Sequence, residues 1–143
     1  MRWLNPVIAG VMLALSAGGA AGEEAGITVR DAWVREAPPG AAMMAGYMAL
    51  RNNSSRAQIL VGARSADFAA VMIHRTTIKN DMAGMQHTPQ IELAPNENLL
   101  FAPGGYHLML MNPKRPMRAG DRVGISLEFR GGLVLPVAFA VRK

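Results

Sequence analysis

Cysteine is absent from the 143-residue sequence. The absence excludes a disulfide framework, a thiolate zinc site, thiol redox chemistry and a catalytic cysteine. It also excludes a blue-copper electron-transfer site, because that site needs a thiolate ligand. Aromatic residues make up only 6% of the sequence, but hydrophobic residues make up 50% and charged residues 17%. This composition and length are typical of one globular domain with its own core rather than of a disordered chain.

Enzyme motifs are missing as well. The sequence has no Gly-x-Ser-x-Gly turn, no P-loop and no dinucleotide-binding fingerprint, and its ten acidic residues are scattered. The formal net charge of +5 is also scattered along the chain, so it predicts no nucleic-acid binding. We therefore expect a protein that is not an enzyme.

The hydrophobic run from Pro6 to Leu15 is too short to span a bilayer. Arg2 precedes the run, and small residues followed by Glu23 and Glu24 come after it. This order predicts a signal peptide over residues 1–22 and a domain over residues 23–143 that is exported to the periplasm. The alternative is an uncleaved membrane anchor, although the sequence has no cysteine for lipid attachment.

The exported part is predicted to be all-β, because short apolar segments alternate with turn residues throughout it. Gly131-Gly132 indicates a two-residue hairpin turn between the last two segments. A helix over residues 66–78 is an alternative, but β-branched residues and the lack of a helical period disfavour it. Eight or nine strands at this spacing indicate a Greek-key sandwich or barrel. The expected strands are residues 27–34, 44–51, 58–63, 71–78, 91–93, 98–101, 106–111, 122–129 and 133–141.

Methionine is abundant, with eleven residues against three histidines. His107, Met109 and Met111 lie two residues apart on an expected strand, so their side chains share one face. His74 ends another apolar segment, and His87 lies with methionines in an expected Gly-containing loop over residues 79–87. Neutral imidazole and thioether ligands favour Cu(I), whereas calcium and magnesium need oxygen ligands. The alternative is that the methionines fill the core and the histidines are structural or solvated.

The spacing of these residues matches a longer pattern. His74, Met85, His107 and Met109 form the motif H-x10-M-x21-H-x-M. The segments DAWVREAPPG, GYMALRN and PGGYHLMLMNPKRP flank the motif residues. With these segments, the chain from about residue 27 to residue 141 resembles the periplasmic PCuAC-type copper chaperones. The resemblance implies a cupredoxin-like Greek-key β-sandwich that binds one Cu(I) per monomer through His74, Met85, His107 and Met109.

The resemblance also implies a role. Such proteins deliver Cu(I) toward the binuclear copper A centre of cytochrome c oxidase subunit II, often alongside Sco-type thiol proteins. Some have a His- and Met-rich C-terminal tail that binds Cu(II); this sequence ends in AFAVRK, so we expect no such second site. We expect a monomer. Two alternatives remain open at this point: a periplasmic copper-buffering or copper-resistance protein using the same site, and a metal-free interaction module.

The remaining histidine and methionines are expected to pack in the core, lie at the rim of the site or lie in solvent rather than bind the metal. Met72 and Met111 are expected in the core or at the rim of the site. His87 and Met82 are expected in solvent. Met85 is expected to be the most mobile ligand, because it falls in the loop. Methionines of an early strand are expected to pack in the core or a loop: Met43, Met44 and Met48.

Overall fold

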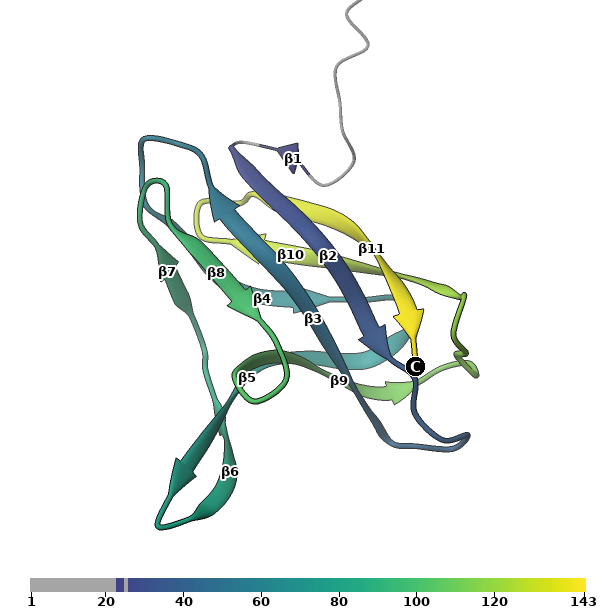
Figure 1. Ribbon diagram of the computed structural model, residues 1–143. Helices are drawn as coiled ribbons and strands as arrows, with labels where there is room; N and C mark the ends of the chain where they lie inside the picture. The colour runs from purple at the N-terminus through teal and green to yellow at the C-terminus, as the bar shows by residue number, and fades with distance from the viewer. Residues whose placement is uncertain (1–22, 25) are drawn as a thin grey trace, which may run out of the picture.

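A computed structural model describes residues 23–24 and 26–143, and the expected signal peptide lies outside these residues. The described residues form eleven β-strands and no helix, which confirms the all-β prediction (Figure 1). Accordingly, no helix in this range could cross a membrane. The strands are β1 Glu23–Glu24, β2 Ile27–Arg35, β3 Met43–Asn52, β4 Gln58–Arg64, β5 Phe68–Lys79, β6 Met82–His87, β7 Ile91–Leu93, β8 Asn98–Phe101, β9 Tyr106–Pro113, β10 Arg122–Phe129 and β11 Val134–Arg142.

The expected count of eight or nine strands is too low, mainly because residues 79–87 are not a loop. They contain β6, which pairs with β5 in a hairpin around Asn80 and Asp81. Both turn residues have positive φ, 53° and 60°, as a type I′ hairpin turn requires. The helix alternative for residues 66–78 is wrong, since these residues are largely β5. Very short β1 is the other strand that was not expected.

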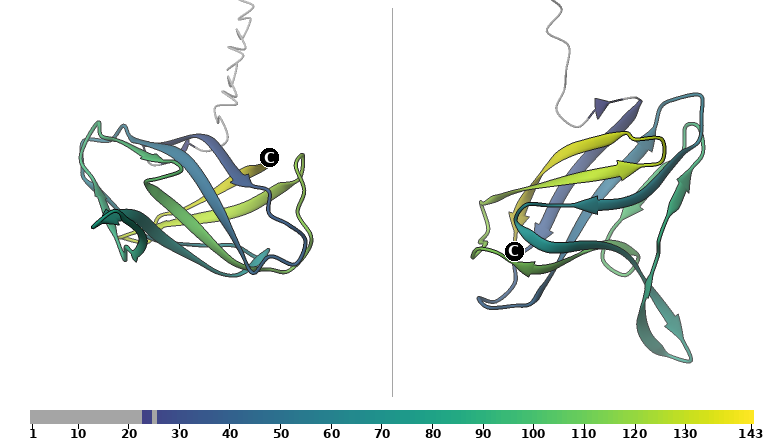
Figure 2. Two further views of the ribbon diagram at one scale, coloured as in Figure 1. Left: turned by 60° about the horizontal axis from the view of Figure 1, so that its bottom comes forward. Right: turned by 180° about the vertical axis from the view of Figure 1, so that it is seen from behind.

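The strands form one hydrogen-bonded sheet in the order β6-β5-β9-β8-β3-β2-β11-β10-β4-β7. In addition, β1 pairs with β2, and β3 also pairs with β9. Most neighbours are antiparallel, but β11 pairs with β2, and β8 with β9, in parallel. The sheet folds over itself into two facing layers, as Figures 1 and 2 show from three directions. This is the cupredoxin-like β-sandwich expected from the sequence. The predicted hairpin joins β10 to β11, and both Gly131 and Gly132 have positive φ. Its loop is longer than the two residues expected, because the Phe129 N–H donates to the Leu133 carbonyl.

The core lies between the layers and follows from the alternation of side chains along each strand. Val123, Ile125, Leu127 and Phe129 of β10 are all buried, and the residues between them are more exposed. The same alternation in β11 buries Leu135, Val137, Phe139 and Val141. Residues on the outer face of the sheet do not form this core, so they can include side chains of a binding site.

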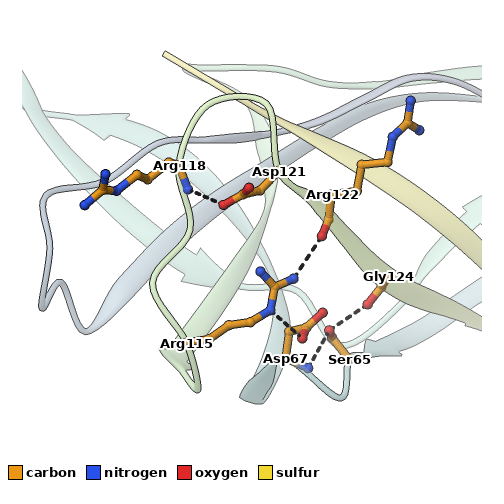
Figure 3. A network of polar contacts seen from close by, with 7 residues as sticks. All are labelled: Ser65, Asp67, Arg115, Arg118, Asp121, Arg122 and Gly124. Carbon is orange, nitrogen blue, oxygen red and sulfur yellow. Dashed lines mark hydrogen bonds and ion pairs between the residues drawn. The ribbon is translucent and has the colours of Figure 1, made fainter.

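A polar network ties the start of β5 to the chain between β9 and β10 (Figure 3). Arg115 forms an ion pair with Asp67 at 3.1 Å and donates to the carbonyl of Arg122 at 2.9 Å. The Ser65 hydroxyl donates to the Gly124 carbonyl at 2.6 Å. These contacts hold the ends of β5 and β9, the two strands that contain His74 and His107.

Candidate metal centre

The three histidines lie side by side across three neighbouring strands. In the sheet register, His74 of β5 is opposite His87 of β6 on one side and opposite His107 of β9 on the other. The ring centroids of His74 and His87 are 5.7 Å apart, and those of His74 and His107 are 5.8 Å apart. Directly opposite residues project to the same face, so all three imidazoles share one face. The β5–β6 hairpin extends beyond the body of the sandwich (Figure 1).

Two of these imidazoles have nitrogen atoms without hydrogen-bond partners. Both ring nitrogens of His74 and Nε2 of His107 are buried and unpartnered, and no other buried side-chain nitrogen or oxygen in residues 26–143 is. His107 is only 5% exposed. Buried polar atoms are nearly always hydrogen-bonded, and a bound ion is one of the groups that can satisfy these nitrogens.

His107 is oriented by the backbone. Its Nδ1 lies 3.4 Å from the carbonyl oxygen of Gly105, which also accepts a hydrogen bond from the Thr76 N–H of β5. A carbonyl only accepts hydrogen bonds, so this contact favours the tautomer with the proton on Nδ1. The lone pair on Nε2 is then available to a metal, an arrangement common among metal-binding histidines.

The surroundings of His74 favour its neutral form. Burial, and then the positive charges of His107 and His87 when these are protonated, lower the pKa of His74 from its usual value of 6.5. A metal binds the neutral imidazole. His74 therefore stays ready to bind a metal at a lower pH than an isolated histidine does.

The methionines of the motif lie on the same face as the histidines. Met109 is two residues from His107 on β9 and lies opposite Met72 of β5. Met85 is two residues from His87 on β6 and lies opposite Thr76. The expectation that Met85 sits in a loop is therefore wrong, but its side chain is 64% exposed, as a position near a projecting hairpin allows. The structure thus brings His74, Met85, His107 and Met109 to one face of β6, β5 and β9.

Methionine sulfur is needed to complete a metal site here. Within the described residues, no three His, Cys, Asp or Glu side chains converge closely enough to hold a metal ion. The adjacent unpartnered imidazoles and the nearby thioethers form a neutral, soft donor set. Such a set suits Cu(I) better than a hard divalent cation.

The exposure of the remaining methionines and of His87 agrees with the expectations except at Met43. Met44 and Met48 are buried in the core as expected, but Met43 is 53% exposed, so the packing prediction is wrong for that residue. Met82 is exposed as expected and points to the opposite face from Met85. His87 is exposed, but its position opposite His74 was not foreseen. The sequence feature that could have predicted this position is the turn at Asn80 and Asp81. A two-residue hairpin there pairs residue 79 with residue 82 and therefore residue 74 with residue 87.

A separate cavity of about 550 Å³ lies between residues 36–42 and 112–118. Met44 and Met117 contribute apolar surface to it, and Arg115 and Arg118 contribute charge. None of the three histidines and neither Met85 nor Met109 lines it. The candidate metal centre is an exposed face of the sheet and not this cavity.

Comparison with known proteins assigns the chain to a family. The sequence model of the LpqE-like lipoprotein family matches residues 27–141. The chain belongs to the LpqE-like family. One relative, the protein Lxx21020 of Leifsonia xyli subsp. xyli (strain CTCB07), is named as a lipoprotein. It is 36% identical over 118 residues, which are 82% of this chain and 70% of that protein.

Solved structures of a PCuAC domain and of the protein DR1885 share the fold of this LpqE-like chain. The copper-bound PCuAC domain from PmoF2 has a TM-score of 0.70 at 26% identity, over 87% of this chain and 96% of that domain. The apo form of DR1885 from Deinococcus radiodurans has a TM-score of 0.66 at 34% identity, over 100% of this chain and 94% of that protein. The Cu(I) form of DR1885 has a TM-score of 0.65 at 36% identity, over 80% and 76%. The resemblance to PCuAC-type proteins noted from the motif is confirmed.

Proposed function

We propose that this protein is a periplasmic Cu(I) metallochaperone that delivers copper toward the copper A centre of cytochrome c oxidase. The observation that supports it most is the pair of adjacent, unpartnered imidazoles of His74 and His107, which have thioethers beside them on the same face. The copper-bound PmoF2 domain and Cu(I)-bound DR1885, both similar in fold, support the choice of metal. The lipoprotein name of the Leifsonia relative supports export.

The proposed ligands of the copper cargo are His74, Met85, His107 and Met109, with one tightly bound Cu(I) per monomer. His107 and Met109 lie on β9, which is paired on both sides, so the sheet fixes their positions before the metal arrives. His74 lies on the adjacent strand, and its lowered pKa keeps the imidazole neutral. Thioethers have no proton to lose, so Met85 and Met109 bind independently of pH. All four donors are uncharged, which suits a singly charged soft ion.

Release of copper depends on the exposed side of the site. Met85 is 64% exposed on the outermost strand β6, whereas His107 is 5% exposed. A partner's ligand can therefore reach the metal where Met85 binds, while His107 and Met109 still hold it. Transfer then proceeds through a shared-ligand complex with the recipient, for which we propose subunit II of the oxidase or a Sco-type thiol protein. This role requires binding and exchange of an ion and no catalysis by the protein.

A gene deletion tests the biological role. We expect the deletion strain to lose cytochrome c oxidase activity at low copper, to keep ordinary copper tolerance, and to recover activity when copper is added. Wild-type protein restores activity, and the His74→Ala/His107→Ala variant does not. Met82→Leu, which changes an exposed methionine on the opposite face, is the matched control and restores activity. Loss of copper tolerance with normal oxidase activity would favour the buffering alternative instead.

A further inference from the structure

Beyond the proposed site, the same face of the sheet has a group of methionines. Met72 of β5 lies opposite Met109 of β9, and the next methionine along β9, Met111, lies opposite Met43 of β3. Alternation along β9 places Met111 on the same face as His107 and Met109. Met43, Met72 and Met111 thus lie on three neighbouring strands, directly beside the proposed site.

These side chains do not fill the core. Met43 is 53% exposed and Met72 is 38% exposed, and Met111 is half-buried. The neighbouring Met44 and Met48 show what core methionines of β3 look like here, at 7% and 1% exposed. Single exposed apolar side chains are ordinary, and this protein has others such as Ile78 and Leu100. What distinguishes Met43, Met72 and Met111 is that three thioethers are grouped on one face of neighbouring strands.

Met111 lies between the other two methionines and is a neighbour of both. Directly opposite residues such as Met43 and Met111 have Cβ atoms about 5 Å apart, and diagonal neighbours such as Met72 and Met111 are about 7–8 Å apart. Methionine is long and unbranched, so its sulfur can move several ångströms toward a common point. A group of thioethers with no imidazole or carboxylate selects a soft monovalent ion.

We propose that Met43, Met72 and Met111 form a second soft-metal site, which binds Cu(I) more weakly than the site with the histidines. Met72 lies opposite Met109, so an ion held here reaches the first site by exchanging its sulfur ligands for Met109 and then the imidazoles. The claim that these thioethers bind Cu(I) does not depend on the proposed function. The claim that the bound ion then moves to the first site rests on the proposed function.

The test is a Cu(I) titration of the full exported protein against a chromophoric Cu(I) chelator, with three variants. Met43→Leu/Met72→Leu/Met111→Leu removes the sulfurs and nearly keeps the side-chain volumes. His74→Ala/His107→Ala removes the imidazoles of the first site. Met82→Leu is the control, because Met82 is 73% exposed and points to the opposite face of the hairpin. Circular dichroism checks that each variant folds.

We expect the wild-type protein and Met82→Leu to bind two equivalents of Cu(I), one tight and one weaker. The triple leucine variant should lose the weaker equivalent and keep the tight one. The double alanine variant should lose the tight equivalent and keep the weaker one, and X-ray absorption of its bound copper should show sulfur ligands without nitrogen. A single tight equivalent in the wild type that is unchanged in the triple variant would overturn the second site and leave the proposed function intact. A failure of the proposed site would be distinguishable, because the His74→Ala/His107→Ala variant would then still bind one tight equivalent of Cu(I), as the wild type does.

Discussion

His107 and Met109 belong to a strand that is paired on both sides. Folding therefore orders their backbone before copper binds, and copper binding loses less conformational entropy at these two residues. We expect His107→Ala or Met109→Ala to lower Cu(I) affinity by at least about a hundredfold, roughly 2.8 kcal/mol. The measurement is a competition titration, with circular dichroism as the check on folding. The His87→Ala variant should change the affinity of the tight site less than about tenfold, roughly 1.4 kcal/mol. If His87→Ala weakened binding as much as His107→Ala, the ligand set would have to include His87.

The pKa of His74 predicts how the site responds to acid. Protons compete with copper for the imidazoles, so Cu(I) affinity should fall as the pH drops below about 6.5, and the lowered pKa of His74 delays its part of that fall. In the apo protein, the unfolded chain takes up a proton at His74 near pH 6.5 whereas the folded chain resists it. Stability should therefore decrease as the pH falls from about 6.5 to the folded pKa and then level off. Titrations and denaturant unfolding between about pH 7.5 and 5 measure both effects; a constant affinity would argue against imidazole ligands.

The β5–β6 hairpin is the element that controls the exposed side of the site. Asp81 has a φ of 60°, which a β-branched residue adopts only with strain. Asp81→Val should destabilise the hairpin by about 1–2 kcal/mol and speed Cu(I) dissociation roughly tenfold. The midpoint of global unfolding should change little, because no residue of β6 is buried.

The control for this turn is Asp81→Gly, since glycine adopts positive φ freely. Stopped-flow transfer of Cu(I) to a chelator measures the dissociation rate, and hydrogen exchange of the β6 amides measures the hairpin. Asp81→Gly should match the wild type in both. Equal dissociation rates for Asp81→Val and the wild type, with β6 amides exposed in the variant, would show that the hairpin does not retain the metal.

At the scale of elements, the sequence predicts buried strands well and exposed strands poorly. The bounds of β7, β8 and β10 agree with the expected ranges, because their buried and exposed residues alternate or their turns are clear. Strand β6 is exposed at every position, so it has no hydrophobic period to find. The shared face of His107 and Met109 was predictable, because it depends only on the alternation of side chains along one strand. The neighbours His87, Met72 and Met43 depend on the register between strands, which only a turn or the fold determines.

At the scale of the whole molecule, the core and the site occupy separate surfaces of the sheet. Phe139 is fully buried, whereas the candidate ligands are on the outer face. Phe139→Ala should destabilise the protein by about 3–5 kcal/mol through the cavity it leaves. Chemical denaturation with and without one equivalent of Cu(I) measures this. The copper-induced gain in stability should be the same in the variant and the wild type; a smaller gain would mean that core packing and metal binding are coupled.

The central claim is that one tightly bound Cu(I) is held by two imidazoles and two thioethers. The most direct measurement is NMR of protein with ¹⁵N-labelled histidine and ¹³C-methyl-labelled methionine, titrated to one equivalent of Cu(I). The account predicts that the ring nitrogens of His74 and His107 and the methyl groups of Met85 and Met109 shift, while the Met82 methyl does not. Shifts of the His87 ring without the Met85 methyl, or of the methyl groups of Met43, Met72 and Met111 without the ring of either His74 or His107, would contradict it.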